Sequence, residues 1–456
     1  MADLHHQIES QPVIVVLVPL PLHSHLNQAL QLATLIAAYK IPVHYATSAT
    51  HCRQAKLRFN GQKSSDISNI IHFQELPDPI SSYPENNLHP SLNASLELRH
   101  PMTALLQKLS SLSKRVVVIN DSNMAYVVQD IPSISNVESY SFTCISAFSL
   151  LCILSQGILT TEETRFRKIV GGIEKIPQMT QTVTPEILNF LAVQSPYVDL
   201  KHGDIINTCR TLESSYLDLL KDENRDKKPQ WALPLHTLHY RVDGVDKSRD
   251  KCLVWLDKQP PKSVLFVSFG SSTSMVEKQV KELAVGLRGS KQRFLWVLQD
   301  AERADGLSKA WKSGLPDGFE ESVKGIGMVT RDWAPQVEIL GHGSVGAFMS
   351  HCGWNSCMES LSMGVPIVAW PMHSEQPYNA LLVTEMLKAG VAVKECDGDL
   401  VGSDLIKEAI EEIMVSDEGV IKRERAEEIG LSLRKAVEEG GVTRLEVDSF
   451  VKHITR

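Results

Sequence analysis

The residues best suited to chemistry gather in the last third of the chain, where a short apolar run leads to a histidine, a glycine and the start of a helix. Residues 345–349 predict a buried strand, and His351 and Gly353 follow it. A helix capped by Asn355 or Ser356 is expected next. A helix N-terminus offers unpaired N–H groups and the positive end of the helix dipole, which attract anions. The pattern therefore predicts a diphosphate site.

Further polar side chains lie where a sugar would meet that diphosphate. Glu359 follows Asn355 by about one helical turn, so it is expected on the same face, within reach of a diol. Glu375 and Gln376 come after the next apolar run, at 367–370, and supply acceptors and donors for hydroxyl groups. Together these residues favour a ligand that combines a diphosphate, a diol and a sugar.

A second group of polar residues comes from the first third of the chain. The apolar run at 13–19 leads into a polar loop at 19–24, and the run at 115–120 is followed at once by Asp121. Parallel strands end at the same edge of a sheet. Side chains from these two places are therefore expected to converge.

The elements that position these residues follow one pattern along the chain. Short β-branched runs alternate with helical patterns, which indicates an α/β fold of parallel βαβ units. A charged, turn-rich stretch at 221–250 interrupts the alternation, which restarts at 263–269. We therefore expect two doubly wound, parallel-sheet domains that face a central cleft.

The expected boundaries follow from these changes. The N-terminal domain is expected at residues 1–240, a linker at 241–251 and the C-terminal domain at 252–440. The last helix, 441–456, is expected to pack back on the N-terminal domain.

Composition limits the function classes. The chain has 456 residues, of which 43% are apolar and 22% charged, as in ordinary globular proteins. A net charge of −8 without a basic stripe disfavours nucleic-acid binding. Eight cysteines without a CxxC pair disfavour a disulfide framework or a zinc site. No signal peptide or membrane-length apolar run is evident in the sequence, so we expect a cytoplasmic protein without a membrane partner. We also expect a monomer.

The stretch from Trp333 to Gln376, with HCGWNS near its centre, resembles the signature of plant family-1 UDP-sugar glycosyltransferases. The likeness extends to Asn207–Glu213, Cys252–Pro261 and Phe269–Ser271. The resemblance implies the GT-B fold, in which two Rossmann-like domains face each other, the N-terminal one binds the acceptor and the C-terminal one binds the UDP-sugar donor and holds most of the nucleotide. It also implies UDP-glucose as the donor substrate, with no cofactor and no metal.

The same resemblance assigns each part of the donor to particular residues. Trp333, beside Ala334, would stack on uracil; Gln336 and Glu359 would bind ribose; His351, Asn355, Ser356, Ser271 and Thr273 would hold the diphosphate; and Trp354, Glu375 and Gln376 would hold the sugar. A glutamine at position 376 accompanies glucose donors in this family.

The resemblance also assigns His25 as the general base and Asp121 as its partner. An acceptor hydroxyl must lose its proton as it attacks the anomeric carbon, and an imidazole that titrates near neutrality suits that task. A carboxylate on the other ring nitrogen fixes the tautomer. Attack with departure of UDP would invert the α-linked donor to a β-glucoside. Because His23 and Ser24 stand where the family usually has Gln-Gly, His23 is an alternative base.

Residues 19–37 and 117–130 are most similar to the zeatin O-glucosyltransferase subgroup. This similarity implies that the acceptor is the side-chain hydroxyl of a zeatin-type cytokinin. Flavonoids or other plant alcohols as acceptors, and xylose as the transferred sugar, are alternatives. A nucleotide-sugar binder without catalytic activity is a more remote one.

Overall fold

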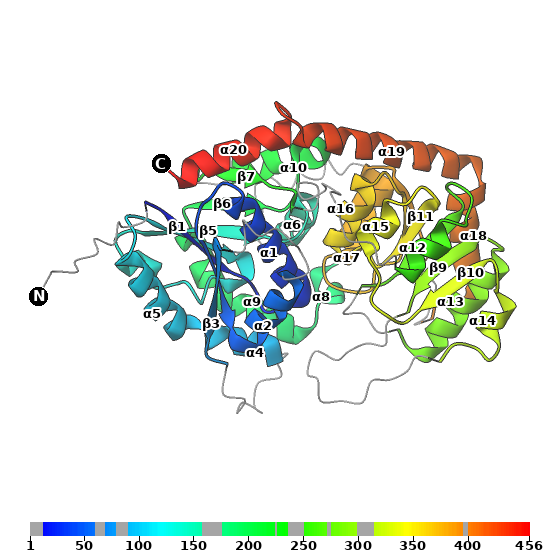
Figure 1. Ribbon diagram of the computed structural model, residues 1–456, viewed down its shortest axis with the longest axis horizontal. Helices are drawn as coiled ribbons and strands as arrows, with labels where there is room; N and C mark the ends of the chain where they lie inside the picture. The colour runs from blue at the N-terminus through cyan, green and yellow to red at the C-terminus, as the bar shows by residue number, and fades with distance from the viewer. Residues whose placement is uncertain are drawn as a thin grey trace, which may run out of the picture.

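The computed structural model describes residues 12–59, 69–78, 90–156, 176–223, 226–235, 250–270, 275–298, 314–394 and 400–456. In these residues, two parallel sheets form two α/β domains that lie side by side (Figure 1). The predicted fold class is therefore confirmed.

The N-terminal domain holds a sheet of seven parallel strands in the order β3-β2-β1-β4-β5-β6-β7. The strands are β1 (Ile14–Val18), β2 (Val43–Ser48), β3 (Ile71–Leu76), β4 (Val116–Asp121), β5 (Val137–Thr143), β6 (Gly203–Ile206) and β7 (Gln230–Ala232). Every residue of β1 and β4 is buried, because helices cover both faces of this parallel sheet.

The C-terminal domain holds six parallel strands in the order β10-β9-β8-β11-β12-β13. They are β8 (Val264–Ser268), β9 (Arg293–Val297), β10 (Gly327–Thr330), β11 (Val345–Ser350), β12 (Ile367–Ala369) and β13 (Gly390–Ala392). The strand order reverses at β1 in the first sheet and at β8 in the second. Ligands of α/β sheets bind beyond the strand ends at such switch points.

Helices cover both sheets. In the N-terminal domain they are α1 (His23–Ala37), α2 (Ala49–Phe59), α4 (Pro90–Leu96), α5 (Arg99–Ser110), α6 (Ala147–Leu154), α8 (Met179–Thr182), α9 (Pro185–Gln194) and α10 (Arg210–Glu223), with 3₁₀ turns at Ser122–Met124, Ile131–Ser133 and Ser195–Leu200. The others are α12 (Lys251–Leu256), α13 (Glu277–Gly289), α14 (Phe319–Ser322), α15 (Gln336–Leu340), α16 (Trp354–Ser362), α17 (Gln376–Leu381), a π-helical turn at Leu382–Met386, α18 (Ser403–Val415), α19 (Asp417–Val437) and α20 (Val442–Ile454).

One apolar cluster crosses the boundary between the domains. It contains Phe148 and Leu217 of the N-terminal domain together with Trp354 and Tyr378 of the C-terminal domain. Burial of such large side chains is the main favourable term in folding and in association. The two domains are therefore held together by a shared core as well as by the chain.

The last two helices join the domains on one side of the molecule (Figure 1). Helix α19 packs on α16 and α18, whereas α20 packs on α10 and β7. The turn between them contains Gly440 with a φ of 77°, a backbone conformation that favours glycine. Val447 and Phe450 of α20 are buried in the core of the N-terminal domain.

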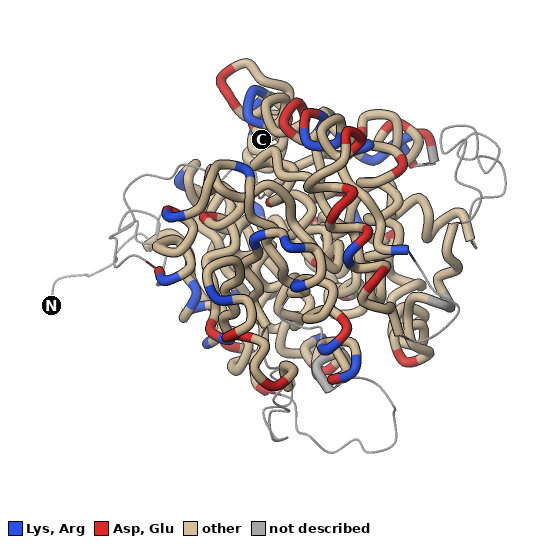
Figure 2. The backbone as a smooth tube through the Cα atoms, turned by 90° about the vertical axis from the view of Figure 1, so that its right-hand side faces the viewer, with Lys and Arg blue, Asp and Glu red and all other residues tan. Residues whose placement is uncertain are grey.

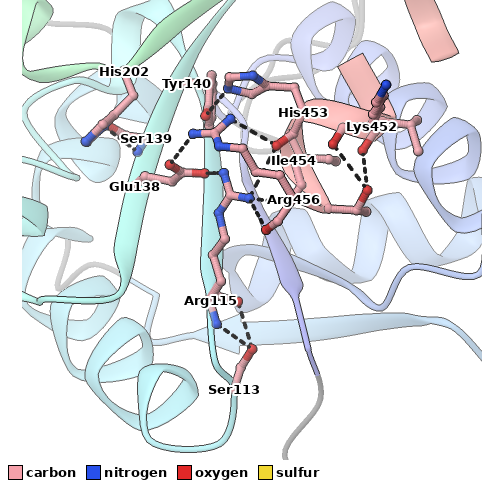
Figure 3. Close-up of polar contacts among 12 residues, drawn as sticks. Ser113, Arg115, Glu138, Ser139, Tyr140, His202, Lys452, His453, Ile454 and Arg456 are labelled. Atoms are coloured by element: carbon pink, nitrogen blue, oxygen red, sulfur yellow. Dashed lines mark hydrogen bonds and ion pairs between the residues drawn. The ribbon is translucent and has the colours of Figure 1, made fainter. Parts of the chain in front are cut away.

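A guanidinium group holds the end of α20 on the N-terminal sheet (Figure 3). Arg115 donates to the carbonyl oxygens of His453, Ile454 and Arg456 at 3.3, 3.0 and 3.1 Å, and it forms an ion pair with Glu138. The last carbonyls of a helix have no partner within the helix, so a cation there satisfies them.

Charged residues of both signs occur throughout the described parts of the chain. Acidic and basic residues are interspersed along the described backbone (Figure 2). Among the described helices, none combines the length and the apolarity needed to cross a bilayer.

Candidate active site

His25 lies in the first turn of α1, directly beyond β1. The loop predicted at 19–24 is shorter in the structure: α1 begins at His23, and the N–H of Leu26 donates to the carbonyl oxygen of Leu22 at 2.9 Å. The imidazole therefore lies at the switch point of the first sheet.

Asp121, the last residue of β4, meets His25. Nδ1 of His25 lies 2.6 Å from Oδ2 of Asp121, and the two side chains are 18% and 2% exposed. The other oxygen, Oδ1, accepts from the N–H of Asn123 at 2.9 Å, and the thiol of Cys144 donates to Oδ2 at 3.3 Å. A carboxylate that accepts all these bonds requires the proton on Nδ1 of His25. In the neutral ring, Nε2 is then the free base.

Four influences set the pKa of His25. Burial lowers it, but the charge of Asp121, its hydrogen bond and the charge of Glu375 together raise the pKa above the ordinary histidine value. Because Glu375 belongs to the C-terminal domain, the base is influenced by both domains.

The alternative base, His23, has different surroundings. Partial desolvation, followed by the positive charge of Arg58, lowers the pKa of His23 to about 4. The carboxylate of Asp121 is bonded to His25. The geometry thus favours His25 as the base that a carboxylate orients.

His25, Asp121 and Cys144 also place three atoms that could bind a metal within 4.8 Å of one another. Burial and then the charge of Asp121 raise the pKa of the Cys144 thiol well above its ordinary value. Metals bind the thiolate, so a raised thiol pKa opposes coordination. The arrangement is better described as two donors that share one carboxylate.

His351 follows β11, at the switch point of the second sheet, and its ring lies against two glycines. A Cβ atom at Gly270 would lie 2.8 Å from Cε1 of the ring, and one at Gly353 would lie 2.6 Å from Nε2. Burial and then the charge of His373 lower the pKa of His351 to about 4, so the ring is neutral. Among the described residues, Nδ1 of His351 has no hydrogen-bond partner. An unsatisfied buried nitrogen fits a site that a polar ligand completes.

The helix that follows starts earlier than predicted. The expectation that Asn355 or Ser356 caps it is wrong, because α16 begins at Trp354 and Gly353 takes the cap position with extended backbone (φ −56°, ψ 138°). Asn355 and Ser356 therefore lie inside the first turn. Ser271 and Thr273, the other predicted phosphate ligands, lie outside the described residues.

The two residues predicted to bind ribose contact each other. Nε2 of Gln336 donates to Oε2 of Glu359 at 2.7 Å and to the hydroxyl of Ser356 at 3.1 Å. Burial raises the pKa of Glu359 to about 7, although the bond from Gln336 lowers it. Ribose-binding and phosphate-binding candidates thus form one hydrogen-bonded group.

The two tryptophans of the signature have opposite environments. Trp333 is 77% exposed, so its ring is free to stack on a planar ligand, and the neighbouring Ala334 is buried. Trp354 is 2% exposed, and its indole N–H donates to the carbonyl oxygen of Asn207 at 2.5 Å. The side chain of Trp354 thus contacts both domains. A sugar can be contacted by the backbone N–H of Trp354, at the start of α16.

Glu375 and Gln376 lie at the start of α17. Oε1 of the buried Gln376 accepts from the N–H groups of Met372 and His373 at 2.9 and 3.1 Å. Two backbone donors fix this amide, so its Nε2 is the end that can donate to a hydroxyl group. Glu375 is half-buried.

The site also contains residues that sequence reasoning missed. Gln28 on α1 contacts Asn355 of the donor half, and Asn379 of α17 accepts from Ser146 and Ser149 at 2.9 and 2.8 Å. Only Gln28 had a signal in the sequence, because it follows His25 by three residues and so lies on the same helical face. The partners of the others depend on tertiary structure.

A separate recess of about 440 Å³ lies in the C-terminal domain, lined by residues such as Lys251, Trp255 and Met328. Its lining contains none of the predicted site residues.

Two family models match the chain. "Glycosyltransferase, N-terminal domain" matches residues 11–237, and "UDP-glucoronosyl and UDP-glucosyl transferase" matches residues 210–423. The chain is 44% identical to the zeatin O-glucosyltransferase of Phaseolus lunatus, and the alignment covers 97% of each. It is also 44% identical to the zeatin O-xylosyltransferase of Phaseolus vulgaris, covering 97% of this chain and 98% of the relative.

Solved structures of plant glycosyltransferases have the same architecture. A transferase of Siraitia grosvenorii in complex with UDP superposes with a TM-score of 0.78 at 28% identity, over 97% of this chain and all (100%) of that one. A Phytolacca americana enzyme complexed with UDP-2fluoro-glucose and pterostilbene gives a TM-score of 0.78 at 26% identity, over 97% and 99% of the two chains. These matches confirm the GT-B arrangement of the two domains.

Proposed function

The chain belongs to the UDP-glycosyltransferase family, and we propose that it transfers glucose from UDP-glucose, with inversion, to a hydroxyl group of a small plant metabolite. The observation that carries the proposal is the 2.6 Å contact between Nδ1 of His25 and Oδ2 of Asp121. This contact leaves Nε2 of His25 as a basic nitrogen at the switch point of the N-terminal sheet. The residues proposed to bind the diphosphate lie at the switch point of the C-terminal sheet.

In the proposed reaction, Nε2 of His25 accepts the proton of the acceptor hydroxyl. The oxygen attacks the anomeric carbon, a new C–O bond forms, and the bond from that carbon to the β-phosphate oxygen breaks. The imidazolium is stabilised by the carboxylate of Asp121, which accepts from Nδ1. A single displacement of this kind inverts the α-linked donor to a β-glucoside.

The departing UDP carries the negative charge that the C-terminal domain would stabilise. We assign the N–H groups at the start of α16, together with His351, Asn355 and Ser356, to the diphosphate, and we include Ser271 and Thr273 on the resemblance alone. Such preorganised donors stabilise charge as it develops, without the help of a metal. Trp333 beside Ala334 would stack on uracil, and Gln336 and Glu359 would bind ribose.

The sugar would lie between the domains, against Glu375, Gln376 and the backbone of Trp354. Nε2 of Gln376, which lies 3.4 Å from Nδ1 of His373, can also donate to a sugar hydroxyl, which agrees with glucose. Xylosyl transfer is a second candidate, because the chain is equally identical, at 44%, to a glucosyl- and a xylosyltransferase.

For the acceptor we propose a zeatin-type cytokinin. Support comes from the two Phaseolus enzymes and from the cis-zeatin O-glucosyltransferase 2 of Zea mays, which is 36% identical over 98% of this chain. An apolar pocket discriminates modestly among acceptors, so other plant alcohols, flavonoids included, are expected as weaker acceptors.

Mass spectrometry of the products tests donor and acceptor together. Purified protein is given UDP-glucose or UDP-xylose with trans-zeatin, cis-zeatin or a flavonoid. Hexose added mainly to a zeatin supports the proposal, pentose added in preference supports xylosyl transfer, and hexose on flavonoids alone contradicts the cytokinin assignment. Binding of UDP-glucose without formation of any product would support the alternative of a nucleotide-sugar binder without catalytic activity.

We also propose that the protein acts in the cytoplasm as a monomer. The seven described cysteines are all unpaired thiols, as in reducing compartments, and the base and donor candidates come from one chain. A fluorescent fusion and size-exclusion chromatography with light scattering test the two statements.

A further inference from the structure

Gln28 connects the helix that carries His25 to the helix that begins the donor site. It lies on α1, is 3% exposed, and donates through Nε2 to Oδ1 of Asn355 at 2.6 Å and to the carbonyl oxygen of Cys144 at 3.1 Å. Its Oε1 accepts from Nδ2 of Asn207 at 2.7 Å. We refer to Asn207, Gln28 and Asn355 as the amide relay.

Backbone groups determine which way round the amides of the relay lie. At one end, the N–H of Leu235 donates to Oδ1 of Asn207 at 3.0 Å, so Asn207 turns Nδ2 toward Gln28. Near the other end, the carbonyl of Cys144 can only accept, so Gln28 turns Nε2 toward it. Both constraints require the same orientation of Gln28, and the assignment of its oxygen and nitrogen therefore follows from chemistry.

The relay imposes one orientation on Asn355. Because its Oδ1 accepts from Gln28, its N–H₂ group is turned away from Gln28. Asn355 is in the first turn of α16, where the unpaired backbone N–H groups also lie. A reversed Asn355 would present an oxygen to an anion and repel it.

We propose that Gln28 is a positioning residue that holds Asn355 with its N–H₂ group toward the diphosphate of the donor. This inference rests on the proposed function, in which Asn355 contacts the diphosphate. It assigns to α1 a second role beside that of His25, since one helix then carries the base and orients a donor ligand.

A second contact between the domains allows Gln28 to be substituted without detaching α16 from the N-terminal domain. The indole N–H of Trp354 donates to the carbonyl oxygen of Asn207, so the start of α16 stays attached to the N-terminal domain when the side chain of Gln28 is changed. Gln28→Met has nearly the same shape, adds no charge and removes the amide. Gln129→Met is the matched control, because Nε2 of Gln129 donates at 2.7 Å to the carbonyl of Tyr126, three residues away in the chain.

The experiment is calorimetric titration of the full chain with UDP and with uridine, which lacks the diphosphate. We expect Gln28→Met to weaken UDP binding about tenfold and to leave uridine binding within about twofold, as for loss of one hydrogen bond to a charged group. The control should bind both as the unaltered protein does. In an Asn355→Ala background, Gln28→Met should cause no further loss of UDP affinity.

Retained UDP affinity in Gln28→Met, or an equal loss for UDP and uridine, would overturn the inference. Failure of the unaltered chain to bind UDP would instead contradict the proposed function. If circular dichroism shows that Gln28→Met does not fold, Gln28→Asn takes its place with the same expectations, because it keeps an amide that is too short to reach both partners.

Discussion

Nδ1 of His25 and Oδ2 of Asp121 lie 2.6 Å apart although 96 positions separate the residues in the sequence. They meet because β1 and β4 are adjacent parallel strands, in which Val18 pairs with Asn120. His351 is placed in the same way, after β11 and beside β8. Each half of the site thus lies where the strand order of its sheet reverses.

Replacing Asp121 by Asn is expected to lower turnover and to shift its pH dependence. Burial lowers the pKa of His25, and the charge and hydrogen bond of Asp121 reverse this shift to a net rise. The base acts when unprotonated, so turnover rises with pH through this pKa. Without the charge of Asp121, the pKa of His25 falls, so the rise in turnover moves to lower pH. The plateau of turnover at high pH falls by about 10²- to 10⁴-fold.

The pH–rate profile of kcat/KM measures both effects, with His23→Asn as the control. The control should keep the position of the unaltered profile. A profile that moves with His23→Asn and stays in place with Asp121→Asn would make His23 the base.

Glu359→Gln is expected to stabilise the ligand-free protein at alkaline pH and to weaken UDP binding. Burial raises the pKa of Glu359 to about 7 in the folded chain, against about 4.3 in an unfolded one. The folded state therefore binds this proton more tightly, and the free energy of unfolding falls as pH rises between the two values. The variant lacks this loss, so its melting temperature should exceed that of the unaltered protein by more at about pH 8 than at about pH 5. An equal difference at both pH values would show that the carboxyl does not titrate in this way.

Arg115→Ala is expected to loosen α20 from the N-terminal sheet. The variant loses the bonds to His453, Ile454 and Arg456 and leaves Glu138 without that ion pair. We expect the free energy of unfolding to fall by about 1.5 to 3 kcal/mol, measured by urea denaturation. The control Lys281→Ala removes an exposed ion pair with Glu277 within α13 and should cost less than about 0.5 kcal/mol. Equal losses in the two variants would contradict the anchoring role.

Chelation is expected to leave turnover unchanged. The charge of the departing diphosphate would be met by N–H groups and side chains at the start of α16. Turnover with EDTA, compared with turnover in added magnesium or manganese, measures this. A loss in EDTA that either metal restores would contradict a metal-independent reaction.

Much of this architecture could be predicted from the pattern of apolar runs, because those at β1, β4, β8 and β11 are buried along their whole length. The family resemblance is confirmed by the matched relatives over nearly the whole chain. The residues at which helices begin were harder to predict from the sequence. At α1 and α16 the helical turn begins before any residue with a capping side chain.

The contacts between the domains could not be predicted. Gln28, Asn207 and Asn379 are amides whose partners come from distant parts of the chain, and a sequence pattern carries no information on such pairs. The same holds for Trp354, whose signature position indicated the sugar while its indole N–H contacts Asn207.

The most direct test of the account compares unaltered protein with His25→Ala, using UDP-glucose and trans-zeatin, with product measured by mass spectrometry and UDP affinity by calorimetry. The account predicts a hexose adduct from the unaltered protein, and about 10²- to 10⁴-fold slower formation by His25→Ala at unchanged UDP affinity. Undiminished product formation by His25→Ala would contradict the assignment of the base, and absence of any adduct with either protein would contradict the proposed reaction.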